Sequence, residues 1–340
     1  MTSRKAVAAP QAVQGTLALE EGRAKPPRAV SSARQSPDKA RKGLVRSEAR
    51  SGPLLPDIHK QRDFFLADIL DVAIKDDGAS MEAPIFALAT KPDLSQWHWK
   101  SQDGKRSVTV IPSTLGRATI WDKDILIYCI SQIVEGLNRS RSDAENEQRT
   151  VRFTVYDYLM TTNKGSRVNG RGYKDFEAGL ERLQGTLIRT DIATGGKRTK
   201  ERFPLIEKSK IVEKSPDDHR MVAVEITFSP WVWNAIQAFE VLTLNRTYFR
   251  LRGGLERRLY ELARKHCGDQ ASWSIGFDVL HAKSGSRATA KEFRRMLKSA
   301  IETDGLPDYR IAYDEEKELV VFYTKDVKKL AMKLLHATSV

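Results

Sequence analysis

The sequence SRATAKEFRRMLKSAIETDG, residues Ser286–Gly305, is typical of one amphipathic helix. Thr289 followed three residues later by Glu292 indicates a capping box, which satisfies the free N–H groups at the start of a helix. Gly305 is expected to end the helix, because glycine accepts the left-handed backbone conformation that follows a last turn. The apolar residues that recur at helical spacing, and so share one face, are Phe293, Met296, Leu297 and Ala300.

The opposite face of this predicted helix is cationic. Basic residues repeat the same spacing about 200° around the helix axis: Lys291, Arg294, Arg295 and Lys298. Two short strands are expected to follow, at 308–313 and 318–323. This pattern is that of the recognition helix of a winged helix-turn-helix, in which apolar residues anchor the helix and basic residues contact DNA. For the charge run alone, a solvated surface helix is the alternative interpretation.

An internal repeat extends this interpretation to the first half of the chain. Residues 153–167, FTVYDYLMTTNKGSR, align without gaps with residues 273–287, WSIGFDVLHAKSGSR, and both segments end in Gly-Ser-Arg. After a three-residue gap, Phe176 and Leu180 match Phe293 and Leu297. An amphipathic helix precedes each block, at 121–139 and 254–267. Predicted β-pairs follow, 187–192 with 201–213 and 308–313 with 318–323.

We therefore predict an α+β protein with two tandem winged-helix domains. Alternation on both sides of Asp103-Gly104, from Trp97 to Val110, predicts a β-hairpin with a two-residue turn before the first domain. Residues 1–60 are rich in Ala, Pro, Ser, Arg and Lys and predict a disordered basic arm. The predicted divisions are 1–60 for the arm, 61–240 and 241–325 for the domains, and 326–340 for a basic C-terminal helix or tail.

Charge and composition limit the class of protein. The chain has 340 residues and a net charge of +13, of which the 60 residues of the arm carry +7, so a nucleic-acid surface on the folded part must be local. No apolar run approaches the ~18 residues of a membrane span, and no secretory signal is recognisable. Cys129 and Cys267 lie among apolar neighbours in helical patterns. We expect buried, reduced thiols and a cytoplasmic protein with no membrane association.

The motifs of common enzymes are absent from the sequence. Gly195-Gly196-Lys197 lacks the remainder of a P-loop. The six histidines are scattered without a His-x-His pair, which argues against a metal-dependent nicking endonuclease, and no Cys/His spacing suits zinc. Asp76-Asp77 is better explained by a loop at the end of a helix or strand than by a metal site. We expect no catalytic residues, no cofactor and no bound metal.

Candidate DNA contacts fall in both units. In the C-terminal unit they are Arg287, Lys291, Arg294, Arg295 and Lys298. In the N-terminal unit they are Arg167, Arg171, Lys174, Arg182, Lys197, Arg198 and Lys200. In the C-terminal helix, Lys291, Arg294 and Arg295 occupy the first turns, where base edges are normally reached. Lys298 is expected to contact phosphate.

The N-terminal helix has a mixed surface, because Glu177 and Glu181 offset Lys174 and Arg182. Its other cations lie in the preceding loop and in the predicted wing. We therefore expect the C-terminal unit to read sequence and the N-terminal unit to hold the DNA backbone.

Longer segments resemble the replication initiator protein A family of bacterial plasmids. They are RDFFLADILD (62–71), SMEAPIFALATKPD (80–93), ATIWDKDILIYCISQI (118–133), GYKDFEAGLERLQGTLIRTDI (172–192) and YFRLRGGLERRLYELARKH (248–266). The resemblance implies a tandem winged-helix initiator that binds double-stranded repeats at a plasmid origin and has no enzymatic activity. It also implies recruitment of the host initiator and helicase, and a homodimer that represses its own promoter. A winged-helix transcriptional regulator and an unrecognised nicking or strand-transfer enzyme are the alternatives.

Overall fold

The computed structural model describes residues 73–139, 149–164, 166, 168–197, 202–215, 218–268 and 270–331. The predicted basic arm lies outside the described residues, as do three candidate DNA contacts, Arg167, Arg198 and Lys200. A helix begins at Val327, but residues 332–340 of the predicted C-terminal helix are also outside. Within the described ranges no helix is long and apolar enough to cross a bilayer. Cys129 and Cys267 are buried, as predicted.

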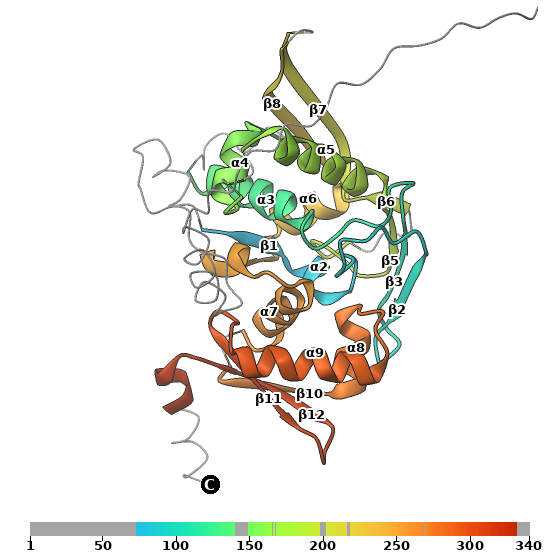
Figure 1. Ribbon diagram of the computed structural model, residues 1–340, viewed down its shortest axis with the longest axis vertical. Helices are drawn as coiled ribbons and strands as arrows, with labels where there is room; N and C mark the ends of the chain where they lie inside the picture. The colour runs from blue at the N-terminus through green and yellow to red at the C-terminus, as the bar shows by residue number, and fades with distance from the viewer. Residues whose placement is uncertain are drawn as a thin grey trace, which may run out of the picture. The chain divides into compact units, whose positions relative to one another are not determined.

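The first part of the chain, as far as Gln237, contains both helices and strands (Figure 1). In chain order they are β1 (Lys75–Asp77), α2 (Gly78–Glu82), β2 (Trp97–Lys100), β3 (Ser107–Ile111), α3 (Lys123–Arg139), β4 (Thr150–Phe153), α4 (Val155–Thr161), α5 (Gly170–Gly185), β5 (Leu187–Thr190), β6 (Arg202–Pro204), β7 (Ile206–Ser215), β8 (Asp218–Phe228) and α6 (Pro230–Gln237).

The second part of the chain begins with a strand and a 3-10 helix and continues with three α-helices and a hairpin. Its elements are β9 (Val241–Thr243), the 3-10 helix Arg246–Arg250, α7 (Gly254–His266), β10 (Ser272–Gly276), α8 (Phe277–Ser284), α9 (Ala290–Thr303), β11 (Tyr309–Asp314) and β12 (Leu319–Thr324). Strand β9 pairs antiparallel with β1, and so joins the start of the second part to the start of the first.

The same order of elements occurs twice, as the internal repeat predicts. In the first copy α3, β4, α4 and α5 precede the hairpin β7–β8, and the sheet order is β4-β8-β7. In the second copy α7, β10, α8 and α9 precede the hairpin β11–β12, and the sheet order is β10-β12-β11. In both sheets the first strand of the copy therefore pairs with its last strand, β4 with β8 and β10 with β12.

The structure corrects the alignment within the repeat. The apolar residues of the third helices match as predicted, because Phe176, Leu180 and Leu183 and their counterparts Phe293, Leu297 and Ala300 are buried at the same spacing. The preceding segment is two residues out of register. Helix α4 begins at Val155, whereas Ile275, its partner in the alignment, lies in β10 and α8 begins only at Phe277.

Two predicted strand pairings are confirmed, but their details differ. Strand β5 pairs antiparallel with β6, as expected for the β-pair at 187–192 and 201–213. This pair was expected to be the first wing, but it joins β2 and β3 in a four-stranded sheet of order β2-β3-β5-β6. The hairpin that follows the helices is β7–β8 instead. The hairpin β2–β3 forms with Trp99 opposite Val108, but residues 101–106 connect its strands. It therefore does not contain the two-residue turn that Asp103-Gly104 suggested.

Helix α9 begins as its sequence predicts and ends one residue earlier than expected. The Thr289 side chain accepts a hydrogen bond from the backbone N–H of Glu292, whereas the Glu292 carboxylate binds Arg295 (2.6 Å). At the other end Asp304, not Gly305, adopts the left-handed conformation, with φ 43°. Aspartate tolerates this region better than most residues, since its short polar side chain bonds locally.

The described residues form one compact body, which contains two hydrophobic cores. Phe176, Leu180 and Leu183 of α5 contribute to the first core. Phe293 and Leu297 of α9 contribute to the second core, and each such side chain stabilises the fold by roughly 1.5–3 kcal/mol. Ile74, Met81 and Ile127 also belong to the second core, although they precede it by more than 100 residues. The segment before the first copy and helix α3 of that copy therefore both contribute to the second core.

Candidate nucleic-acid interface

Helix α9 is fixed by its apolar face and presents its basic face outward. Phe293 and Leu297 are fully buried, and Met296 packs partly buried beside them. Figure 1 shows α9 lying along the β10-β12-β11 sheet, and its nearest strand is β11. The helix is therefore held from behind, as the apolar spacing predicts.

Most cations predicted on the outer face of α9 are paired with carboxylates. The three pairs are Arg294–Glu318 (2.7 Å), Arg295–Glu292 (2.6 Å) and Lys298–Glu315 (2.6 Å). Lys291 is exposed, and no ion pair to it occurs within the described parts of the chain. The Arg295 side chain is 70% exposed, and that of Lys298 is 43% exposed. Both head groups are thus accessible to a ligand that displaces their partners.

Arg294 is held more firmly than its neighbours on α9. Its guanidinium lies 4.5 Å from the centroid of the Phe277 ring at the start of α8. Its Nε donates to the Tyr313 hydroxyl (3.0 Å), and its Nη2 donates to Glu318 (2.7 Å). The Tyr313 hydroxyl also donates to Glu318, which closes the cluster. Arg294 therefore connects α9 to α8 and to the β11–β12 hairpin.

Arg287 contacts the segment that precedes β2. Its Nε donates to the Asp93 carboxylate (2.8 Å), and its guanidinium lies 4.9 Å from the centroid of the Trp97 ring. The buried Arg117 contacts the same carboxylate and the same ring. Burial lowers the pKa of Arg117 to about 10, so this guanidinium stays charged at neutral pH. Arg287 therefore bridges two segments, and its side chain is 44% exposed.

In the first copy of the repeat, α5 corresponds to α9. Asn169 caps its N-terminus by accepting from the N–H groups of Arg171 and Gly172. The side chains of Arg171 and Lys174 are exposed. Arg182 is different, because its Nε and Nη2 donate to both oxygens of Asp122 at 2.8 and 2.7 Å, and it is only 22% exposed. Its guanidinium is therefore used in holding α5 to the start of α3.

Lys197 lies in the connection between β5 and β6. Backbone hydrogen bonds between Thr194 and Lys197 run in both directions and close a tight turn, in which Gly195 and Gly196 have positive φ. The Lys197 side chain is exposed. The turn thus presents a cation at the end of the four-stranded sheet and not on the β7–β8 hairpin.

The β11–β12 hairpin carries an acidic tip, which the sequence-based prediction of DNA contacts did not include. Residues 314–318 read DEEKE, with four carboxylates and one lysine. Two of these carboxylates, Glu315 and Glu318, form ion pairs with α9. The run itself was visible in the sequence. Its relation to α9 was not, because it depends on how the hairpin folds back beside the helix.

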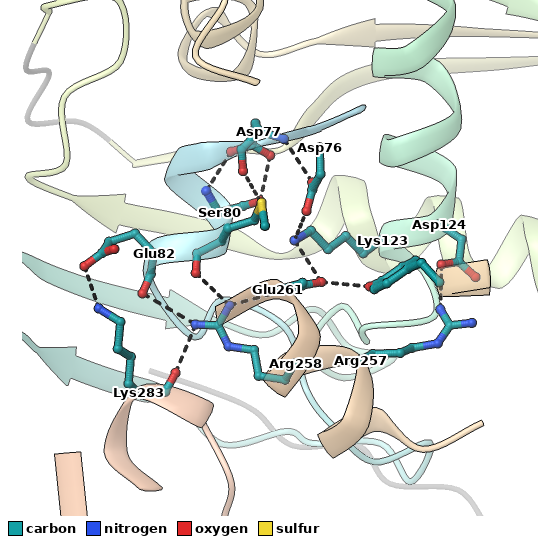
Figure 2. A network of polar contacts seen from close by, with 12 residues as sticks. Asp76, Asp77, Ser80, Glu82, Lys123, Asp124, Arg257, Arg258, Glu261 and Lys283 are labelled. Atoms are coloured by element: carbon teal, nitrogen blue, oxygen red, sulfur yellow. Dashed lines mark hydrogen bonds and ion pairs between the residues drawn. The ribbon is translucent and has the colours of Figure 1, made fainter. Parts of the chain in front are cut away.

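A buried network of charges joins the two copies of the repeat (Figure 2). The Lys123 ammonium on α3 lies 2.6 Å from Asp76 and 3.1 Å from Glu261 on α7. All three side chains are at most 1% exposed. The Tyr248 hydroxyl donates to the same Glu261 oxygen at 2.8 Å. Asp76 is therefore part of an ion pair, and Asp77 caps α2 by accepting from Ser80.

A second link between α3 and α7 lies beside the first. The buried Arg257 donates to Asp124 (2.6 Å) and to two backbone carbonyls, of Leu251 and Phe249. Its neighbour Arg258 donates to Glu261 and to the carbonyls of Met81 and Lys283. Because α3 and α7 are the first helices of the two copies, the Arg257–Asp124 pair fixes one copy against the other, while Arg258 connects α7 to α2 and α8.

Burial has a large effect on the pKa values in this network. Desolvation raises the pKa of Asp76 to about 8, against the opposing attraction of Lys123. Nearby, Lys283 forms a 2.7 Å ion pair with Glu82, which also contacts Arg106. Burial and the charge of Lys283 lower the pKa of His266 to about 4, so this imidazole is neutral at pH 7. These groups are structural, because they bind one another.

Comparison with known proteins assigns the chain to a family. It matches the family described as "Replication initiator protein A" over residues 75–311. It is also 32% identical over 268 residues to a protein of Wigglesworthia glossinidia brevipalpis named "Putative replication protein", covering 77% of this chain and 94% of that protein. The chain belongs to the replication initiator protein A family.

The fold is similar to that of a solved structure. The crystal structure of domains 2 and 3 of RctB superposes with a TM-score of 0.50 at 10% sequence identity. The match covers 73% of this chain and 98% of the RctB chain. At this identity the likeness concerns the mixed helix-and-sheet fold alone.

Proposed function

We propose that this protein initiates plasmid replication by binding repeated duplex DNA sites at the replication origin. The observation that carries the proposal is its membership of the replication initiator protein A family over residues 75–311. The exposed cations on α9 and α5 support it, since sequence-independent DNA affinity comes from basic groups that neutralise phosphates.

The repeated topology supports a tandem winged-helix architecture. In this proposal α5 and α9 are the recognition helices, and β7–β8 and β11–β12 are the wings. A winged helix-turn-helix needs a helix anchored by apolar side chains next to a β-hairpin, and both copies have this arrangement. We place the first domain at 61–240 and the second at 241–325.

The contacts of each cation indicate which ones are candidates for base edges and which for the DNA backbone. On α9, Lys291 and Arg295 are the candidates for base edges and Lys298 is the candidate for phosphate, while Arg294 positions the helix against its hairpin. In the first domain, Arg171 and Lys174 are exposed for backbone contacts. Lys197 adds a phosphate contact from outside the wing.

Replacing Lys197 by alanine is expected to weaken binding to every duplex alike and to flatten the dependence of log affinity on log salt by about one unit.

Arg295→Ala is expected to weaken binding to the origin repeat about tenfold or more and to relax one base position. Fluorescence anisotropy with repeat and scrambled duplexes across a salt series measures both. If each variant lost the same affinity for the repeat as for the scrambled duplex, the assignment of base contacts to α9 and backbone contacts to the first domain would be contradicted.

The remaining parts of the proposal follow from the family resemblance. We propose that the protein acts in the cytoplasm without enzymatic activity, opens the origin, recruits the host initiator and helicase, and forms a homodimer. Incubation with supercoiled origin DNA and a divalent metal ion is expected to melt DNA without nicking it. Nicked circles would support a strand-cleaving enzyme instead.

The test of the function uses the DNA that flanks the gene, where we expect direct repeats of about two helical turns. A plasmid that carries the gene and these repeats should replicate, and deletion of either should abolish replication. The purified full chain should bind the repeat more tightly than a scrambled duplex. Replication without the gene would refute an initiator. Regulated transcription from the adjacent promoter, with replication unchanged, would support a transcriptional regulator.

A further inference from the structure

The β11–β12 hairpin, which we propose is the wing of the second domain, is acidic where it faces α9, the proposed recognition helix. Its tip, residues 314–318, has a net charge of −3. Glu315 Oε1 lies 2.6 Å from the Lys298 ammonium, and Glu318 Oε1 lies 2.7 Å from Arg294. A surface that only clamps phosphates would be expected to carry the opposite charge.

The two wing carboxylates have different surroundings. Glu318 also accepts from the Tyr313 hydroxyl, and its arginine lies over the Phe277 ring, so this pair belongs to a packed cluster. The Glu315–Lys298 pair has no such support, with Glu315 58% and Lys298 43% exposed. Exposed pairs of this kind are weak, because water and salt screen them. A phosphate group is thus able to displace Glu315 from Lys298.

We propose that Glu315 acts as an internal competitor for DNA phosphate at Lys298 and so limits the sequence-independent affinity of the second unit. This inference rests on the proposed function, because it assumes that α9 faces duplex DNA. The proposed base contacts of Lys291 and Arg295 do not involve an ion pair with residues 314–318 among those described. Glu315 therefore limits the phosphate contact of Lys298, which is the electrostatic part of DNA affinity.

Counterion release gives the inference a distinctive signature. A lysine that neutralises a phosphate releases a cation from the DNA, which steepens the salt dependence by about 0.9 units. When Lys298 leaves Glu315 to do so, an ion pair that salt screens is broken, and the cost of breaking it falls as salt rises. This cost offsets part of the salt dependence. Removing the carboxylate should therefore both strengthen binding and steepen its salt dependence.

The test compares Glu315→Gln with Glu316→Gln in the full chain. Both remove one negative charge from the same turn, but only Glu315 is paired with α9. On a scrambled duplex at low salt, Glu315→Gln is expected to raise affinity about three- to tenfold and to steepen the salt slope by less than about one unit. For Glu316→Gln we expect less than about a twofold change.

A double-variant cycle separates the ion pair from the general field of the wing. In a Lys298→Gln background, Glu315→Gln should lose most of its effect. An unchanged or lower affinity for Glu315→Gln, an equal effect of Glu316→Gln, or a full effect without Lys298 would each overturn the proposal. If the unmodified chain fails to bind any duplex, the proposed function fails instead. Thermal unfolding of each variant verifies that the fold is retained.

Discussion

Replacing Lys123 by methionine is expected to lower the free energy of unfolding by about 3–5 kcal/mol at pH 8. Lys123 is completely buried between Asp76 and Glu261. Methionine has a similar length but no charge, so both carboxylates lose a partner in a site that water does not reach. Glu261 keeps Arg258 and Tyr248, whereas Asp76 loses its ion pair. Urea unfolding of the wild type and the variant measures the difference.

The deficit should depend on pH in a defined direction. Burial already raises the pKa of Asp76 to about 8 with Lys123 present. Without Lys123 the opposing attraction is lost, and the pKa rises further. Between about pH 4 and pH 8 the folded wild type and the folded variant both keep a proton that the unfolded chain has released, so the deficit changes little. Above pH 8 only the wild type releases this proton, and the deficit grows. We expect a smaller deficit at pH 5 than at pH 9.

Two variants serve as controls for this prediction. Lys317→Met breaks an exposed ion pair with Asp314 and should leave the unfolding midpoint unchanged within error. Adding Asp76→Asn to Lys123→Met should recover part of the loss and remove most of its pH dependence. A deficit that is the same at pH 5 and pH 9 would show that Asp76 does not carry the effect.

Removing three cations from α9 should have the largest effect on DNA binding. The variant Lys291→Gln, Arg295→Gln, Lys298→Gln keeps Arg294, which joins the helix to its hairpin. We expect at least about a hundredfold weaker binding to the origin repeat at low salt. Because Lys291 and Arg295 are candidates for base edges and only Lys298 is a candidate for phosphate, the salt slope should fall by at most about one unit. Anisotropy titrations across a salt series measure both.

A matched variant removes the same charge elsewhere. Lys91, Lys105 and Lys328 are exposed and lie outside α5 and α9. Their replacement by glutamine changes the net charge by the same amount and should weaken binding much less. Equal losses for the two triple variants would mean that net charge, and not the surface of α9, drives binding.

The helices could be predicted from the sequence more fully than the strand partners. The apolar spacing of α5 and α9 and the cap at Thr289 depend on residues within one or two turns, and the structure confirms them. The hairpin that belongs to the first copy could not be assigned in this way. Strands β5 and β7 both follow α5 with suitable residues, and the choice depends on β3, which pairs with β5 from about 80 residues away.

The candidate DNA contacts show the same limit. Periodicity placed Arg294 with Lys291 and Arg295 on one face, yet it gave no sign that Phe277 and Tyr313 would hold the Arg294 guanidinium. Likewise Arg182 appeared as a surface cation because its partner, Asp122, lies 60 residues earlier. Helical periodicity predicts the face of the helix from which a side chain points. It does not predict which side chains of other helices or strands pack against that face.

Local sequence was sufficient for the amphipathic helices, the repeated order of elements and the family, because each depends on patterns between residues close together in the chain or on long stretches of similar sequence. Tertiary structure alone decided which cations face solvent and which charges are buried. Asp124 and Arg257 are 133 positions apart, and Glu82 and Lys283 are 201 apart. Folding buries both pairs, and a charge removed from water requires a partner wherever the chain brings one.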